Sequence, residues 1–354
     1  MADHLHFEHL YIGGSARQGE SGPLDVDDPA DESVFATAPA ASLGQFGQAV
    51  EAARQAFDKG PWPSLPASRR VETLARMAGW LASRREELVE TAVRETGSTL
   101  QLARWAQVDM SIEQAHQLPE LFAGLPEWEH NELPLDTYLG PDGRDVTLSI
   151  RRYEPCGVVA AITPYNFPLQ TNVWKVFSAL ATGCTVVLRP SPLCPLTALA
   201  LGEAAAEAGL PPGVLNVVVE SGSSGAEMLT SDPRVDCVSF TGSTAVGRRI
   251  AAQAARTVKR VLLELGGKSV QLSETQRTHI KDIVVKDRNV ARAENVNFSI
   301  DVGVAVPRTV HVAVLPADIV DVVPEYRGFD YVVVGDQLLI IDPNTMLIVE
   351  VLPV

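Results

Sequence analysis

The sequence between residues 156 and 242 contains four short apolar runs, CGVVAAIT (156–163), CTVVLRP (184–190), VLNVVVE (214–220) and VDCVSFTG (235–242). A fifth run, KRVLLELGG (259–267), follows them. The segments between these runs have helical patterns, at 167–183, 195–209, 225–231 and 243–255. Continuous apolar strands that alternate with helices are typical of a parallel sheet covered on both faces. We therefore predict an α/β fold with a Rossmann-like open parallel sheet.

The sequence before this stretch is mainly helical. A short strand and turn are expected at 10–14, and the Gly-, Ser-, Asp- and Pro-rich residues 13–31 indicate a loop. Helical periodicity then covers about 42–58, 67–95 with an interruption near Ser83, and 100–123. Gly97 follows the second of these segments and ends it.

Residues 136–154 (DTYLGPDGRDVTLSIRRYE) predict a hairpin. The PDG tripeptide is a turn signal, and Val146, Leu148 and Ile150 alternate with polar neighbours. Such a hairpin is either a simple surface feature or an edge that pairs with the sheet of another subunit. The hairpin therefore offers a route to a homo- or hetero-oligomer.

Composition excludes several classes of protein. The chain of 354 residues has 46% hydrophobic and 21% charged residues, which is a globular composition, and its net charge of −15 argues against a nucleic-acid partner. It has no strongly basic run and no apolar run that could span a bilayer, so no membrane partner is expected. Residues 1–14 do not have the pattern of a signal peptide, and the four scattered cysteines fit a reducing cytoplasm. His4, His6 and His9 indicate a solvated terminus rather than a metal site.

Four segments carry a resemblance when they are taken together. They are Thr163-Pro164-Tyr165-Asn166-Phe167-Pro168 with Lys175, Val187-Leu188-Arg189-Pro190-Ser191-Pro192, Ser239-Phe240-Thr241-Gly242-Ser243-Thr244 with Gly247, and Leu263-Glu264-Leu265-Gly266-Gly267-Lys268-Ser269. In order and spacing they resemble the aldehyde dehydrogenase superfamily over about residues 8–272. We therefore expect residues 1–272 to form an aldehyde dehydrogenase-like domain that binds NAD or NADP.

The resemblance also assigns site residues. Glu264 matches the general base of the family, and Asn166 matches the side-chain donor of the oxyanion hole. The cofactor site would comprise residues from all four segments and two others: Thr163, Pro164, Tyr165, Lys175, Arg189, Ser191, Gly222, Phe240, Thr241, Gly242, Ser243, Val246, Leu265 and Gly266. Where the family usually has lysine this chain has Arg189, and the acidic residue often found three positions later is Pro192, so the choice between NAD and NADP stays open.

The residues of these segments have simpler interpretations too. Gly242 and Ser243 close a strand and open a helix, which suits a phosphate at the positive helix end, but Ser243 could equally be an ordinary N-cap. Asn166 could be a turn residue, and Lys175 a solvated charge on a helix.

The catalytic cysteine of the family lies downstream of the Glu-Leu-Gly-Gly-Lys segment, and no cysteine of this chain follows Glu264. Cys184 and Cys237 lie in apolar strands and are expected to be buried and inert, Cys156 to lie away from the site, and Cys194 beside the adenosine end. Without a thiolate the chain alone is not expected to oxidise an aldehyde substrate.

The remaining residues predict a linker at 273–300 and a small β-rich domain at 301–354. That domain resembles a bacterial domain of unknown function, through Val306-Pro307-Arg308, Pro324-Glu325-Tyr326-Arg327-Gly328, Val333-Val334-Gly335-Asp336 and Ile341-Asp342-Pro343. A three-strand meander is expected there, so the chain is interpreted as a fusion, either functional or a product of gene rearrangement.

Three hypotheses on function follow. The chain is a cofactor-binding protein without dehydrogenase activity, an active dehydrogenase completed by a partner subunit, or an interaction protein that uses the hairpin and the tail strands. Glu264 alone could still support weak ester hydrolysis.

Overall fold

The computed structural model describes residues 9–134, 142, 146–266, 274–286, 291–293, 296, 300, 304, 306–307, 309–343, 346 and 348–353. They form two compact units, which divide between Leu265 and Gly266. Each unit has its own buried core, so each is described by itself.

A seven-stranded sheet forms the centre of the first unit, with the strand order β11-β10-β7-β8-β9-β1-β2. The five strands from β11 to β9 are parallel, which confirms the predicted sheet, while β1 pairs antiparallel with both β9 and β2. The strands are β1 (Leu10–Ile12), β2 (Ser15–Arg17), β7 (Val158–Ile162), β8 (Thr185–Arg189), β9 (Leu215–Val217), β10 (Cys237–Gly242) and β11 (Arg260–Leu265).

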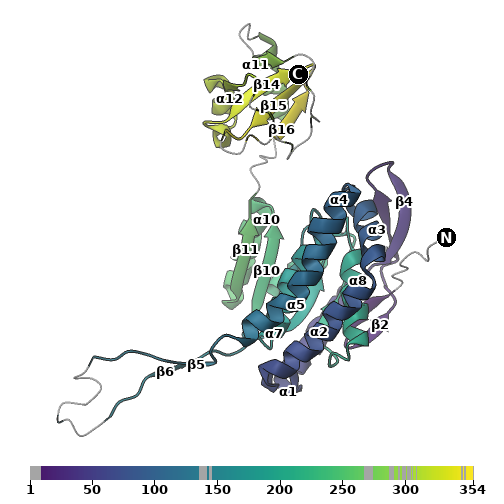
Figure 1. Cartoon of the computed structure of the whole chain (residues 1–354), viewed down its shortest axis with the longest axis vertical. Helices are drawn as coiled ribbons and strands as arrows, with labels where there is room; N and C mark the ends of the chain where they lie inside the picture. Colours follow the sequence, from purple (N-terminus) through teal and green to yellow (C-terminus); the bar gives the residue numbers. More distant parts are fainter. Residues whose placement is uncertain are drawn as a thin grey trace. The chain divides into compact units, whose positions relative to one another are not determined.

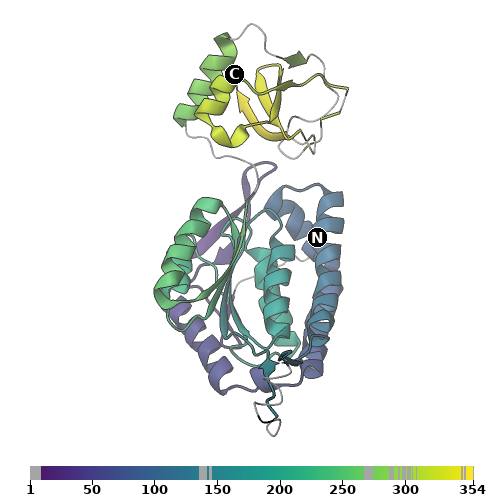
Figure 2. The same ribbon diagram turned by 90° about the vertical axis from the view of Figure 1, so that its left-hand side faces the viewer.

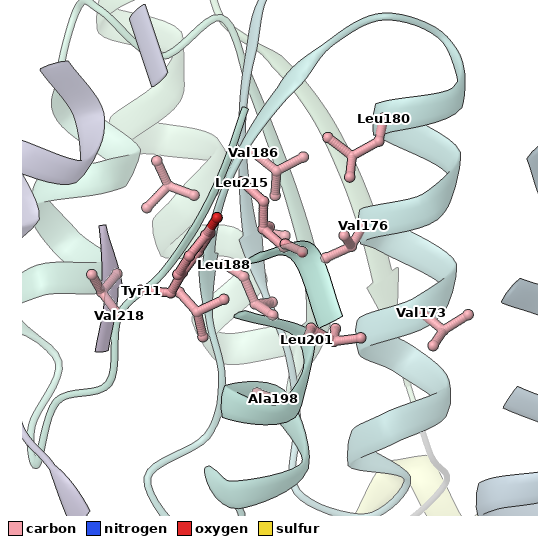
Figure 3. Close-up of a cluster of buried hydrophobic side chains, with 14 of the residues drawn as sticks. Tyr11, Val173, Val176, Leu180, Val186, Leu188, Ala198, Leu201, Leu215 and Val218 are labelled. Atoms are coloured by element: carbon pink, nitrogen blue, oxygen red, sulfur yellow. The ribbon is translucent and has the colours of Figure 1, made fainter. Parts of the chain in front are cut away.

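Helices cover both faces of this sheet (Figure 2). One face packs against α7 (Pro168–Ala181) and α8 (Leu196–Glu207), and the other packs against α1 (Leu43–Lys59), α9 (Ser224–Ser231) and α10 (Thr244–Ala254). Val176 and Leu180 of α7 gather with Leu201 of α8 against the side chains of β8 (Figure 3). These contacts explain why the strands read as continuous apolar runs, because residues on both sides of each inner strand are buried.

Further helices lie outside α7 and α8. They are η1 (Trp62–Ser64), α2 (Ala67–Ser83), α3 (Arg85–Thr96), α4 (Leu100–Leu102), the π-helical η2 (Ala103–Asp109) and α5 (Met110–Ala123). On the other face, η3 (Ala255–Thr257) extends α10. Their ends follow from local sequence. Ser42 and Gln45 form a capping box at the start of α1, and Gly97 ends α3 with a φ of 66° that favours glycine.

The prediction of a loop at 13–31 was wrong in part. The structure has β2 there, and also β3 (Pro23–Asp28), which pairs with β4 (Ser33–Pro39) in a separate two-stranded sheet. Only Val26 of β3 is buried, and three of its six residues are aspartates beside one proline, so its composition is that of a loop. Strand β3 is extended because it pairs with β4, and its sequence has no apolar pattern that would indicate a strand.

The hairpin begins before the predicted segment. Its strands β5 (Trp128–His130) and β6 (Ile150–Arg152) pair antiparallel and form a ribbon that leaves the helical body (Figure 1). The backbone N–H of Asn131 donates to the carbonyl of Ser149 at 2.9 Å and extends the ladder. Most of the PDG turn lies outside the described residues.

The second unit has a five-stranded sheet in which β12, β14, β15 and β16 are neighbours in that order and β13 also pairs with β14. Its elements are α11 (Glu274–Lys286), β12 (Arg292–Ala293), β13 (Ala313–Val314), α12 (Ala317–Val322), η4 (Pro324–Tyr326), β14 (Asp330–Val334), β15 (Gln337–Ile341) and β16 (Ile348–Pro353). The predicted meander corresponds to β14, β15 and β16.

Residues 273–300, predicted as a linker, contain a helix of the second unit. Helix α11 occupies the first half of this segment, and Ile280 and Val284 are buried in the core that α12 and the sheet share. These two residues are one helical turn apart among charged neighbours, so the sequence carries only a weak apolar stripe. Within the residues that the structure describes, no helix has the length and hydropathy needed to cross a membrane.

Candidate functional site

The carboxyl ends of the parallel strands bring the predicted segments together. The chain moves from β7 to β8 through α7, and it reaches β10 through α9, so the direction of winding reverses between β7 and β10. In open α/β sheets ligands bind in the crevice at such a point. Ile162 pairs with both Arg189 and Phe240, and Thr241 pairs with Glu264, so the ends of four strands meet at this edge.

The start of α10 provides a favourable position for an anion. Ser243 is its N-cap, and its hydroxyl accepts a hydrogen bond from the backbone N–H of Val246 at 3.4 Å. Ser243 and Val246 are exposed, and the first turn of the helix holds no acidic residue. A Cβ on Gly247 would lie 2.4 Å from the Leu265 side chain, so glycine allows α10 to approach β11 closely. An exposed helix N-terminus at a strand end suits a phosphate group.

Arg189 is held by a partner that the sequence did not predict. Its Nε donates to Glu220 at 2.8 Å, and its guanidinium also donates to the carbonyl of Gly222 at 2.5 Å. Glu220 also accepts the backbone N–H groups of Gly225 and Ala226, at 2.6 and 3.0 Å, near the start of α9. The predicted residues Arg189 and Gly222 are thus brought together, and the acidic end of the run 214–220 was the available signal for Glu220.

The predicted site residues that follow β7 differ in burial. Thr163 is buried, and its hydroxyl donates to the Asn172 side chain at 2.7 Å, which fixes the strand end to α7. Tyr165 and Asn166 lie on an exposed bend just before α7, with Pro164 half-buried beside them. Ser191, after β8, is buried and its hydroxyl accepts the N–H of Leu193.

A hollow of about 600 Å³ lies on the α7 side of β10 and β11. Lys175 and Glu264 are both in its lining, and Lys175 Nζ donates to the Ser239 hydroxyl at 2.9 Å. Burial lowers the pKa of Lys175 to about 8, although the nearby Glu264 carboxylate acts to raise it. Lys175 is therefore a half-buried cation tied to β10, not the solvated helix charge of the simpler interpretation.

Cys156 precedes β7, at the amino end of the sheet, opposite the strand ends where the candidate site lies. This residue lines the same hollow as Lys175 and Glu264, together with Cys184 and Cys237. Cys184 and Cys237 are buried as expected, but they face this hollow from the sheet. Cys194 is buried elsewhere, where its thiol donates to the carbonyl of Glu95 at 3.0 Å.

Comparison with known proteins identifies two families in the sequence. The model of the aldehyde dehydrogenase family matches residues 16–273, and that of a domain of unknown function, DUF1236, matches residues 284–353. The second match begins earlier than the predicted residue 301 and includes the end of α11.

Curated relatives are dehydrogenases. Betaine aldehyde dehydrogenase 1 of Oryza sativa is 38% identical over 270 residues, which cover 73% of this chain and 51% of that protein. Phenylacetaldehyde dehydrogenase of Pseudomonas fluorescens is 39% identical over 269 residues, which cover 75% of this chain and 53% of that protein. The chain thus spans about half the length of the curated relatives it matches.

Solved structures agree with this similarity. Betaine aldehyde dehydrogenase from Staphylococcus aureus in complex with NAD+ matches with a TM-score of 0.68 and 32% identity, over 74% of this chain and 50% of that one. A mutant of aldehyde dehydrogenase C from Pseudomonas syringae, in complex with NAD+ and octanal, matches with a TM-score of 0.66 and 34% identity, over 78% and 55% of the two chains.

Proposed function

Because this chain belongs to the aldehyde dehydrogenase family, we propose that its first unit binds NAD and that the chain alone does not oxidise aldehydes. The arrangement at the carboxyl ends of β7, β8, β10 and β11 is the observation that supports NAD binding most strongly. The structural neighbours that are in complex with NAD+ support the same cofactor.

The proposal gives each part of the site a role. The pyrophosphate would lie at the N-terminus of α10, where Ser243 and the following amides offer donors. The adenosine end would lie toward Arg189 and Gly222, at the neighbouring end of β8. The nicotinamide would lie near Glu264 and Gly266, at the end of β11. Bound NAD would supply a hydride acceptor, while Asn166 and Lys175 would position groups beside it.

Arg189 and Glu220 favour NAD over NADP. A free arginine at this position could pair with a 2′-phosphate, but the Arg189 guanidinium already pairs with Glu220 at 2.8 Å in a buried setting. The carboxylate both neutralises the guanidinium and repels a phosphate dianion. Glu220 therefore disfavours a 2′-phosphate at this edge, as an acidic residue at position 192 would. NAD is thus the preferred dinucleotide.

Cys156, Cys184 and Cys237 lie at the amino ends of their strands, the wrong end of the sheet for acyl transfer, and Cys194 is buried against Glu95. Cys237 pairs with Arg260, whereas Glu264 pairs with Thr241, four residues farther along β10. At roughly 3.3 Å per residue, Cys237 lies about 13 Å along the strand from the Glu264 level. A thiolate must reach both the carbonyl carbon and the nicotinamide, so these cysteines do not replace a nucleophile beside Glu264.

Titration with NAD and NADP tests cofactor binding. We expect saturable quenching of tryptophan fluorescence, because Trp174 is 46% exposed beside Lys175, and tighter binding of NAD than of NADP. Ser243→Asp keeps a good N-cap but places a carboxylate at the phosphate position, so NAD affinity should fall at least about tenfold. Thr99→Asp makes the same change at the N-cap of α4 and should leave affinity unchanged. Equal affinities of wild type and Ser243→Asp would contradict the assigned phosphate position.

Turnover tests the second half of the proposal. Purified chain with saturating NAD and a panel of simple aldehydes should form no NADH above the level of a protein-free control. Steady NADH formation at rates typical of enzymes, about 1 per second or more, would refute it. A mixture with a full-length dehydrogenase that is more active than the same amount of that dehydrogenase alone would instead favour completion by a partner subunit.

We further propose that the β5–β6 ribbon is a contact between subunits. Trp128 and Ile150 are 52% and 50% exposed on a ribbon that projects from the body (Figure 1). Exposed apolar side chains on a two-stranded ribbon are costly unless another surface covers them. A second chain would provide that surface.

A further inference from the structure

Strand β11 is an open edge of the seven-stranded sheet. Within the described part of the chain it pairs only with β10, over six residues without a bulge or a proline. The opposite edge strand, β2, has only three residues. Sheet edges are usually kept from further pairing by short length, proline, bulges or a covering element. None of these protects β11, because Leu262 near its centre is 61% exposed, so another strand can extend the sheet there.

The backbone of β11 has hydrogen-bonding groups on its outer side. The N–H of Arg260 donates to the carbonyl of Asp236 at 3.0 Å, so the peptide groups of Arg260 point toward β10. The N–H and C=O groups of successive strand residues point alternately to the two sides of the strand. Val261 and Leu263 therefore present their N–H and C=O groups at the open edge.

Three side chains of β11 lie on the same face of the sheet. Leu262 and Glu264 line the hollow on the α7 side, and Arg260 is on their face because it is two residues before Leu262. All three are exposed. The edge therefore presents a cation, an apolar side chain and an anion, in this order and at equal spacing.

This order is self-complementary in an antiparallel pair of two copies. A two-fold axis at Leu262 places Leu262 opposite itself and places Arg260 opposite Glu264 twice. It also places Val261 opposite Leu263, so the outward backbone groups of these two residues meet as a hydrogen-bonded pair. The pairs of Leu262 with itself and of Arg260 with Glu264 are then non-hydrogen-bonded pairs, whose Cα atoms are about 4.5 Å apart and whose side chains lie closest.

The charges select this register over others. A shift by two residues in either direction leaves Arg260 and Glu264 without an opposite charge across the pair. A parallel pair in register would place each charge opposite its own kind, which destabilises a sheet. Opposite charges and apolar side chains that face each other across strands stabilise it.

We propose that β11 is a dimer interface, at which it pairs antiparallel with β11 of a second copy of this chain and joins two seven-stranded sheets into one. The contact is separate from the β5–β6 ribbon and from the N-terminus of α10. It therefore adds a second surface for assembly and does not depend on the dinucleotide.

Charge reversal tests the register in the full chain. The background is the Trp128→Ser/Ile150→Ser variant, which removes the apolar side chains of the ribbon, and light scattering should show a dimer. Arg260→Glu places carboxylates opposite each other twice, so the mass should halve. Adding Glu264→Arg restores opposite charges, and the dimer should return. Arg17→Glu makes the same change of charge on β2, at the other edge of the sheet, and should leave the dimer intact.

A cross-link locates the two-fold axis. In Leu262→Cys the introduced thiols of two copies lie opposite each other, within the Cα separation that a disulfide spans, so mild oxidation should produce a covalent dimer. Val258→Cys is the control, because Val258 is 89% exposed. Its counterpart in the second copy lies about 26 Å away along the strands, so it should not link.

Several results would overturn the proposal. They are a monomer in the ribbon variant, a dimer that withstands Arg260→Glu, a loss of mass that Glu264→Arg does not restore, and a cross-link through Val258→Cys rather than Leu262→Cys. A strand of another kind on this edge, such as the ribbon of a second copy, would give the third result. Mass and cross-linking are measured without dinucleotide, so a failure here leaves the proposed NAD binding intact.

Discussion

Glu95 is a buried carboxyl whose partners lie far away in the sequence. It belongs to α3, yet its oxygens accept the backbone N–H groups of Leu196 and Thr197 at 2.5 and 3.3 Å. These amides open α8, so Glu95 takes the place of a local cap. Burial outweighs both hydrogen bonds and raises the pKa of Glu95 to about 8.

This raised pKa predicts a pH dependence of stability. Between the ordinary value of 4.5 and about 8 the folded state holds a proton that the unfolded state has lost. The free energy of unfolding should therefore fall as pH rises through this window. Glu95→Gln removes the titration, so urea unfolding at pH 5 and pH 8 should show wild type losing about 2–4 kcal/mol relative to the variant. Parallel curves for the two proteins would contradict this expectation.

Single residues also show what sequence can reveal about a site. Ser243 was predictable as an N-cap, because a cap depends on local spacing. Glu220 was not, since its role depends on β8 and β9 lying side by side and placing Arg189 within 2.8 Å. The contact between Cys156 and Cys184 was not predictable either, because only strand register brings these two residues together.

At the scale of elements, strongly patterned segments were predictable and weakly patterned ones were not. The boundaries of α1, α2 and α3 follow from periodicity and from residues such as Ser42 and Gly97. Strand β3 is polar and α11 buries few residues, so each depends on its neighbours for its structure. Contacts with segments far away in the sequence determine the structure of such elements, and a local stretch of sequence does not reveal those contacts.

The β5–β6 ribbon carries a prediction about assembly. Trp128→Ser combined with Ile150→Ser removes two exposed apolar side chains from its base, and we expect the oligomer to dissociate in light scattering. Leu100→Ser removes a 58% exposed side chain of α4, at the end of the helical body opposite the ribbon (Figure 1), and should leave the mass unchanged. A wild-type monomer, or an unchanged mass in the double variant, would exclude the ribbon as a subunit contact.

At the scale of the whole molecule, two families meet in one chain. Residues 16–273 match the aldehyde dehydrogenase family, and residues 284–353 match DUF1236. The first unit has five parallel strands whose carboxyl ends lie at one edge of the sheet, whereas the matched segment covers about half the length of the curated relatives. We interpret the chain as a dinucleotide-binding unit joined to a small β-rich unit, without a thiol beside Glu264.

Hydrogen–deuterium exchange with and without NAD tests this interpretation most directly, because it reports binding and its location together. The account predicts that NAD slows amide exchange at residues 242–247, at the start of α10, and much less in β14, β15 and β16 of the second unit. Unchanged exchange at 242–247 under saturating NAD, or protection confined to another part of the chain, would contradict it.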